Sequence, residues 1–115
     1  MLDSGELYIC TLTETAAAGM KPAPRLVPEE ESRAYERRRI GYGRIYAAKG
    51  ADERIDAVYR IWDDMSETVR IGQYVLTDSG NQYQIDAVQP TTDEHGLLVL
   101  DLTLSRVEDY YDIAE

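Results

Sequence analysis

The chain has 115 residues, and its 12 Lys and Arg against 22 Asp and Glu give a formal net charge of −10. This length supports one hydrophobic core, so we expect a single domain over residues 1–115. Cys10 is the only cysteine and His95 the only histidine. The composition therefore excludes an intrachain disulfide, and it excludes Cys/His zinc sites and Cys-His or Ser-His-Asp catalysis unless that histidine takes part.

Charge is distributed unevenly along the chain. Residues 1–57 hold 9 basic and 10 acidic side chains, a net charge of −1, whereas residues 58–115 hold 3 and 12, a net charge of −9. Solubility alone accounts for such acidity, which also disfavours binding of the second half to a phosphate backbone. The longest uncharged apolar run covers only residues 97–100, and the start of the chain is acidic. These features predict neither a membrane span nor a secretion signal.

The first predicted strand covers residues 6–14, where apolar side chains alternate between two faces. Residues 15–34 follow as a flexible loop or arm, because turn-forming residues interrupt them: Gly19, Pro22, Pro24 and Pro28.

Two interpretations stay open for the next segment. Residues 29–38 have helical features, since Pro28 precedes an acidic first turn and Glu29 stands four residues before Arg33. From residue 39 to 48 the sequence alternates with period two, which favours a strand. This strand can begin as early as Tyr35.

The clearest local signal is a hairpin between residues 74 and 88. Two strand-like segments, 74–77 and 82–88, flank a turn in which Gly80 supplies a left-handed conformation. Residues 54–62 are rich in Val, Ile, Tyr and Trp and predict another strand.

The last strand covers residues 97–106, with Leu98, Leu100, Leu102 and Leu104 on one face. Pro90 is expected to end the strand before it. Together these segments predict an all-β, mainly antiparallel fold. We expect a small β-barrel or sandwich of five to six strands, with long loops, at most one or two short helices and a terminal segment at 107–115.

No catalytic, cofactor-binding or metal-binding constellation emerges from the sequence. Asp63 and Asp64, like Asp52 and Glu53, flank predicted strands and are interpreted as solvated loop ends, and His95 as an exposed turn residue. The chain is therefore expected to be no enzyme and to need no cofactor.

The candidate interaction residues are a basic cluster and two terminal aromatics. Arg37, Arg38, Arg39 and Arg44 either balance the glutamates beside them or bind an acidic partner surface, for which a second copy of the chain is a candidate. Tyr110 and Tyr111 either pack on their own domain or dock on a neighbour.

The order of several motifs resembles the small head-tail joining proteins of tailed bacteriophages, also called head-closure, stopper or adaptor proteins, in versions from Gram-positive phages and prophages. The segments that resemble this family are SGEL (4–7), GYGRIYAA (41–48), VYRIW (58–62), IGQYV (71–75), GNQYQIDAV (80–88) and LDLTL (100–104). The resemblance covers most of residues 35–111. It departs at Tyr46, where many relatives have Trp before Ala.

The resemblance implies a β-barrel that forms a homo-oligomeric ring in the virion neck, made in the host cytoplasm. Such a ring joins the portal or adaptor of the DNA-filled head to the tail and closes the DNA channel, through which DNA passes without specific binding. It implies no catalytic residue. A further hypothesis is that the acidic half lines this channel. The alternative is a small nucleic-acid-binding or accessory barrel, with residues 33–44 as its basic patch and Tyr42 and Tyr46 as stacking platform.

Overall fold

Strand β1 (Gly5–Thr15) runs through the middle of the fold, which the computed structural model describes for residues 2–15, 23–39 and 55–113. The described residues contain no helix and seven further strands: β2 (Ala23–Pro28), β3 (Arg33–Arg38), β4 (Ala57–Trp62), β5 (Tyr74–Thr77), β6 (Gln82–Thr92), β7 (Leu98–Arg106) and β8 (Asp112–Ile113). The fold is thus all-β, as the alternating patterns predict.

Six of the strands close into a barrel. The hydrogen-bonded order is β3-β4-β7-β6-β5-β1, and an additional pairing of β1 with β3 joins the two ends. The closing contact is short: Gly5, Glu6 and Leu7 pair with Tyr35, Ala34 and Arg33. All neighbours in this ring are antiparallel.

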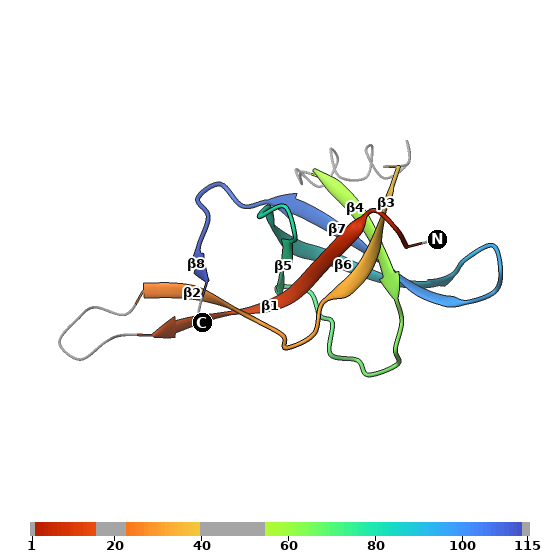
Figure 1. Ribbon diagram of the computed structural model, residues 1–115, viewed down its shortest axis with the longest axis horizontal. Helices are drawn as coiled ribbons and strands as arrows, with labels where there is room; N and C mark the ends of the chain where they lie inside the picture. Colours follow the sequence, from red (N-terminus) through yellow and green to blue (C-terminus); the bar gives the residue numbers. More distant parts are fainter. Residues whose placement is uncertain (1, 16–22, 40–54, 114–115) are drawn as a thin grey trace.

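The second half of β1 leaves the barrel and forms an arm with β2. Cys10 to Thr15 pair with Pro28 to Ala23, and β8 adds to the far edge of β2 in parallel. Figure 1 shows this arm projecting away from the barrel, whereas the first half of β1 forms part of the barrel wall.

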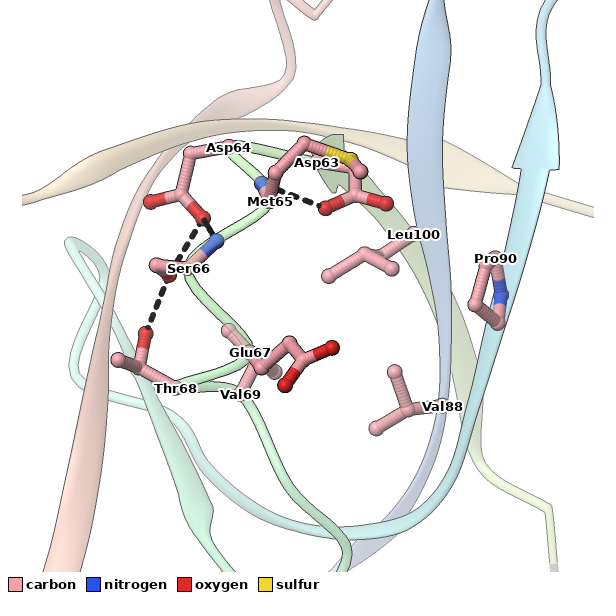
Figure 2. A pocket seen from close by; sticks show the side chains of 10 residues that line it. All are labelled: Asp63, Asp64, Met65, Ser66, Glu67, Thr68, Val69, Val88, Pro90 and Leu100. Carbon is pink, nitrogen blue, oxygen red and sulfur yellow. Dashed lines mark hydrogen bonds between the residues drawn. The ribbon is translucent and has the colours of Figure 1, made fainter.

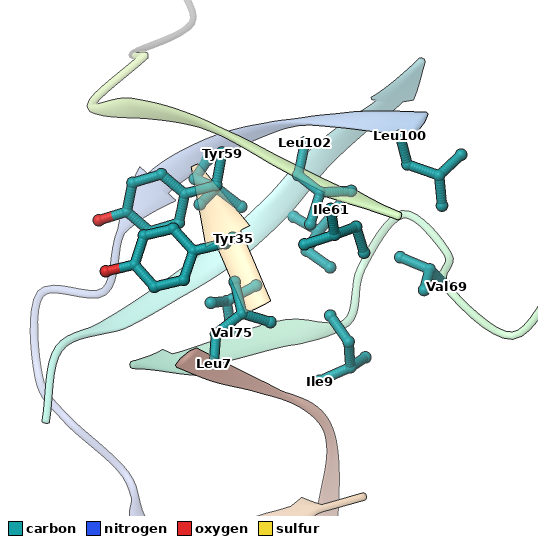
Figure 3. Close-up of a cluster of buried hydrophobic side chains, with 11 residues drawn as sticks. Leu7, Ile9, Tyr35, Tyr59, Ile61, Val69, Val75, Leu100 and Leu102 are labelled. Carbon is teal, nitrogen blue, oxygen red and sulfur yellow. The ribbon is translucent and has the colours of Figure 1, made fainter. Parts of the chain in front are cut away.

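The barrel interior holds the main core (Figure 3). Its buried members are Leu7, Ile9, Tyr35, Tyr59, Ile61, Val69, Val75, Ile85, Leu100, Leu102 and Leu104. Tyr35 and Tyr59 stack with ring centroids 4.5 Å apart, and Tyr83 meets Tyr59 edge to face at 5.6 Å. In a chain without phenylalanine, tyrosines therefore fill one end of the core, with the Tyr59 hydroxyl 3.5 Å from that of Tyr83.

A second, smaller core lies on the other face of β1. Cys10, Leu26 and Tyr74 are buried there, and five partly buried side chains pack on them: Tyr8, Leu12, Leu76, Val107 and Tyr111. Consecutive residues of a strand point to opposite faces, so β1 is apolar on both faces where it passes from barrel to arm.

The C-terminal meander confirms the sequence prediction closely. Strands β5, β6 and β7 are neighbours in the sheet, and Gly80 in the β5–β6 turn has φ +90°. In β7, three of the four leucines predicted on one face are buried, whereas Leu98 at its start is 47 % exposed. Val99 and Thr103, on the other face, are buried as well.

The structure differs from the sequence expectations at three places. Residues 23–28, predicted within a flexible loop or arm, form strand β2 of the arm, because prolines are tolerated in a strand whose outer edge pairs only at Arg25 and Leu26. Of the two interpretations left open for residues 29–38, the helix is absent, and β3 occupies residues 33–38. Burying Tyr35 against Tyr59 requires alternation there, as the strand interpretation held.

Pro90 does not end its strand, since β6 continues to Thr92. Strand β5 pairs with β6 only as far as Gln84, so a nitrogen without hydrogen is tolerated on that edge. The strand predicted from residue 39 to 48 lies, from residue 40 on, outside the described residues.

Barrel closure makes a sharp prediction for Gly5. Its φ is +150°, and a Cβ there would lie 3.0 Å from Asp78 Oδ2 and 3.2 Å from Tyr35 Cε1. We expect Gly5→Ala to lower the free energy of unfolding in urea by about 2–4 kcal/mol through strain and overpacking. Gly80→Ala is the matched control, with φ +90° but no atom within 4 Å, and we expect a loss of about 1–2 kcal/mol. Equal losses would contradict this account of closure.

Candidate functional site

The basic run, residues 37–39, lies at the end of β3. Arg38 is paired with Val58 at the start of β4, so the run sits at the end of the barrel where β4 begins. All three side chains are exposed. Arg44, predicted to belong to the same cluster, lies outside the described residues, as do Tyr42 and Tyr46.

The members of the basic run differ in their partners. Arg38 Nη1 lies 2.8 Å from Glu36 Oε1, and this hydrogen bond lowers the pKa of the Glu36 carboxyl. Hydrogen bonding to Tyr35 raises the pKa of the Arg37 guanidinium. Arg39 has no ion-pair partner among the described residues. The run therefore presents net positive charge at this end of the barrel.

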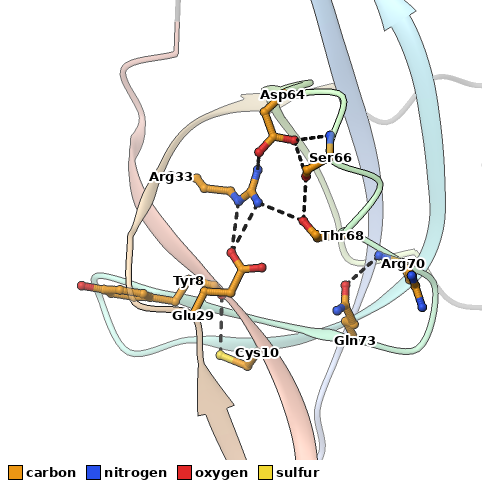
Figure 4. Close-up of polar contacts among 9 residues, drawn as sticks. All are labelled: Tyr8, Cys10, Glu29, Arg33, Asp64, Ser66, Thr68, Arg70 and Gln73. Atoms are coloured by element: carbon orange, nitrogen blue, oxygen red, sulfur yellow. Dashed lines mark hydrogen bonds and ion pairs between the residues drawn. The ribbon is translucent and has the colours of Figure 1, made fainter.

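Arg33, near the opposite end of β3, is fully engaged. Its guanidinium lies 3.4 Å from Glu29 Oε2 and 3.4 Å from Asp64 Oδ2, linking the β2–β3 bend to the β4–β5 loop (Figure 4). The predicted balancing of arginines by neighbouring glutamates is thus confirmed for Arg33 and Arg38. Such partly exposed pairs contribute little stability.

A more strongly placed ion pair was not predicted. Arg60 on β4 donates two hydrogen bonds to Asp101 on β7, at 2.7 and 3.0 Å, and both side chains are mostly buried. The two residues are direct cross-strand partners. Only the register of β4 on β7 brings them together, and no local sequence pattern predicts that register.

The two terminal tyrosines, Tyr110 and Tyr111, have different surroundings. Tyr111 packs edge to face on Tyr74 at 5.5 Å, and Gln82 binds both its backbone N–H, at 2.9 Å, and its carbonyl oxygen, at 2.8 Å. Tyr110 is 45 % exposed and donates from its hydroxyl to Asn81 at 3.3 Å. The sequence left open whether these tyrosines pack on their own domain or dock on a neighbour. Tyr111 packs on its own domain.

A hollow of about 360 Å³ opens at the other end of the barrel, and we call it the acidic hollow. One wall is the β4–β5 loop, residues 63–69, and the opposite wall is formed by Val88, Pro90 and Leu100 (Figure 2). Asp63, Asp64 and Glu67 supply its carboxylates. Asp63 and Asp64 are loop-end residues, as predicted, but the apolar wall comes from β6 and β7 and could not be inferred from the loop sequence.

Hydrogen bonds shape the loop that borders the acidic hollow. Asp63 Oδ1 accepts from the Met65 N–H at 2.9 Å, and Asp64 Oδ1 accepts from the Ser66 N–H at 3.0 Å. Ser66, by both its hydroxyl and its N–H, lowers the pKa of Asp64. Met65 and Glu67 have φ of +63° and +58°, an uncommon conformation for residues with a Cβ.

His95 lies in the turn between β6 and β7 with its side chain 76 % exposed, as predicted. Among the described residues, no group of three or more His, Cys, Asp or Glu is placed to hold a metal ion. In residues 2–15, 23–39 and 55–113 there is no helix with the length and hydrophobicity needed to cross a membrane.

Comparison with protein-family models and with curated protein sequences finds no match to this chain. A function is therefore proposed from the fold, these surfaces and the resemblance of the sequence motifs.

The contrast between Tyr110 and Tyr111 can be tested by truncation. We expect Tyr111→Ala to lower the free energy of unfolding in urea by about 1.5–3 kcal/mol, because the ring leaves a gap beside Tyr74. Tyr110→Ala is the matched control and should cost under about 1 kcal/mol. If the two variants were equally stable, the packing of the C-terminal segment on β5 and β6 would not contribute as described.

Proposed function

We propose that this chain is a non-enzymatic virion neck protein of a tailed phage or prophage, which forms a ring that joins the DNA-filled head to the tail. Its partners are copies of itself, the portal or adaptor on the head side and the tail proteins. It is made in the host cytoplasm and acts at the head-tail interface.

The observation that carries the proposal is where the motifs resembling the joining proteins lie in the barrel. The SGEL lead contains Gly5, whose conformation and close packing belong to barrel closure. The motifs of residues 58–62 and 100–104 lie in the adjacent strands β4 and β7, and the Gly-containing hairpin is β5–β6. The motif of residues 41–48 lies outside the described residues. The others belong to connected strands of one closed barrel, which supports a shared architecture rather than a chance succession of hairpins.

The projecting arm also supports a structural role. Beyond Cys10, the edge of β1 that faces β5 in the barrel has no strand partner among the described residues. Exposed strand edges and protruding hairpins are surfaces on which other chains add. A barrel with such an arm can contact a neighbour without disturbing its own core.

The acidic second half adds a functional expectation to this proposal. DNA passing through a ring is repelled by negative charge and does not adhere to the wall. We propose that part of this acidity faces the channel. A ring structure with residues 58–115 mainly on its outer wall would contradict that placement.

Deletion of the gene from the phage or prophage that encodes it tests the proposed function. We expect lysates with separate heads and tails and almost no infectious particles, because joining is lost before infection. Electron microscopy and plaque counts provide the measurement. Wild-type chain supplied in trans is the control and should restore joined virions, whereas joined, infectious virions in the deletion lysate would refute the proposal.

The alternative, a nucleic-acid-binding barrel, is supported by the exposed basic run beside Tyr59 and Tyr83. Titration with double- and single-stranded DNA at low and moderate salt separates the two functions. For a neck protein of net charge −10 we expect no binding at moderate salt. Tight binding with a steep salt dependence, lost on Arg37→Ala, would favour the alternative.

A further inference from the structure

We propose that the acidic hollow of one copy binds the arginine side chain of Arg39 in the basic run of a second copy. This head-to-tail contact would be the repeating interface of the ring, so the inference rests on the proposed function and specifies its partner surface.

The chemistry of the acidic hollow favours a side chain with an aliphatic stem and a cationic head. Val69, Val88, Pro90 and Leu100 offer an apolar surface for the stem. Its volume of about 360 Å³ lies at the low end for ligand sites, which is appropriate for one side chain rather than a large ligand.

Two carboxylates of the acidic hollow are available for the cationic head. Asp64 is already bound to Arg33 at 3.4 Å. Asp63 uses one oxygen for the Met65 N–H, and no cationic partner reaches its carboxylate within the described ranges. The carboxylate of Glu67 projects across the hollow toward Val88, and it too has no cationic partner in the described part of the chain. A planar guanidinium hydrogen-bonds to a carboxylate through two N–H groups, which suits a cationic head in this hollow.

The same chain offers this cation at its other end. Arg38 pairs with Val58, whereas the acidic hollow begins at Asp63, five residues further along the chain and directly after the end of β4. At a rise of about 3.3 Å per residue, these points are about 16 Å apart along the strand. Figure 1 shows the end of β3 and the β4–β5 loop at opposite ends of the barrel. Arg39 therefore cannot occupy the hollow of its own copy.

Complementary surfaces at opposite ends of one chain produce a heterologous contact. Such a contact repeats from copy to copy and closes into a ring when the rotation between copies allows it. Within the basic run, Arg39 is the arginine to reach the neighbour, because Arg38 is bound to Glu36 and Arg37 lies beside Tyr35.

Charge reversal tests the pairing directly. We expect Glu67→Arg and Arg39→Glu each to weaken self-association by roughly 10–100-fold, since each places like charges in the contact. A mixture of the two variants should associate again. The basic run reversed by Arg39→Glu then meets the hollow reversed by Glu67→Arg. The unchanged run of the Glu67→Arg variant likewise meets the unchanged hollow of the Arg39→Glu variant. The double variant in one chain should recover too.

Sedimentation velocity at low and moderate salt measures these associations. Glu94→Arg is the matched control, because Glu94 is also exposed but lies outside both surfaces, and it should associate as the wild type does. Thermal unfolding of each variant shows that the barrel is intact. A wild-type chain that stays monomeric at low salt, or single reversals that the mixture does not restore, would overturn the inference.

A small probe tests the hollow independently of assembly. Titration with n-butylguanidinium chloride should shift the backbone amide NMR signals of residues 63–69, and n-butanol should shift them much less. Unchanged signals would overturn the inference. The deletion experiment measures joining, whichever surfaces of the protein form the contact. If the chain is needed for joining but its hollow does not bind the guanidinium, only this contact is refuted. Binding and restored pairing in a chain not needed for joining would refute only the proposed function.

Discussion

Strand β1 is the element on which the rest of the structure depends. It pairs with β3 and β5 within the barrel and with β2 in the arm. One strand therefore supplies hydrogen-bonding partners to an edge of each of these three strands. If β1 were removed, β3 and β5 would both become open edges, and the core would lose Leu7 and Ile9. The closing pairing with β3 involves only three residue pairs, and Gly5 is among them. Closure therefore depends on the absence of a side chain at one position.

The two-sided burial of β1 explains the path of the C-terminal segment. Leu7 and Ile9 face the barrel core, so Cys10 necessarily faces away from it. That outer face would expose apolar surface if Leu26 and Tyr111 did not cover it. Burial there raises the pKa of the Cys10 thiol to about 11, and the thiol stays neutral and packs as a small apolar group.

Local patterns predicted those parts of the fold whose partners are near in sequence. The β5–β6 turn, with Gly80, and the leucines of β7 follow from alternation and turn chemistry alone. Strand β2 did not, because its prolines are acceptable only on an edge that tertiary pairing defines. Likewise, the Arg60–Asp101 pair and the acidic hollow require residues about 20 to 40 positions apart to meet. Periodicity contains no information on such register, so the candidate site was less predictable than the strands around it.

The fold also changes how the charge of this chain is grouped. Along the sequence the division is between two halves, but β3 and β4 run antiparallel and bring both halves to each end of the barrel. Arg33 from the first half is neutralised by Asp64 from the second. Next to the two ends of β3 and β4 lie an arginine run on one side and carboxylates over an apolar wall on the other. In the proposed ring, like ends of two copies would repel and unlike ends attract, so the head-to-tail contact proposed above is consistent with this distribution and a symmetric pair is not.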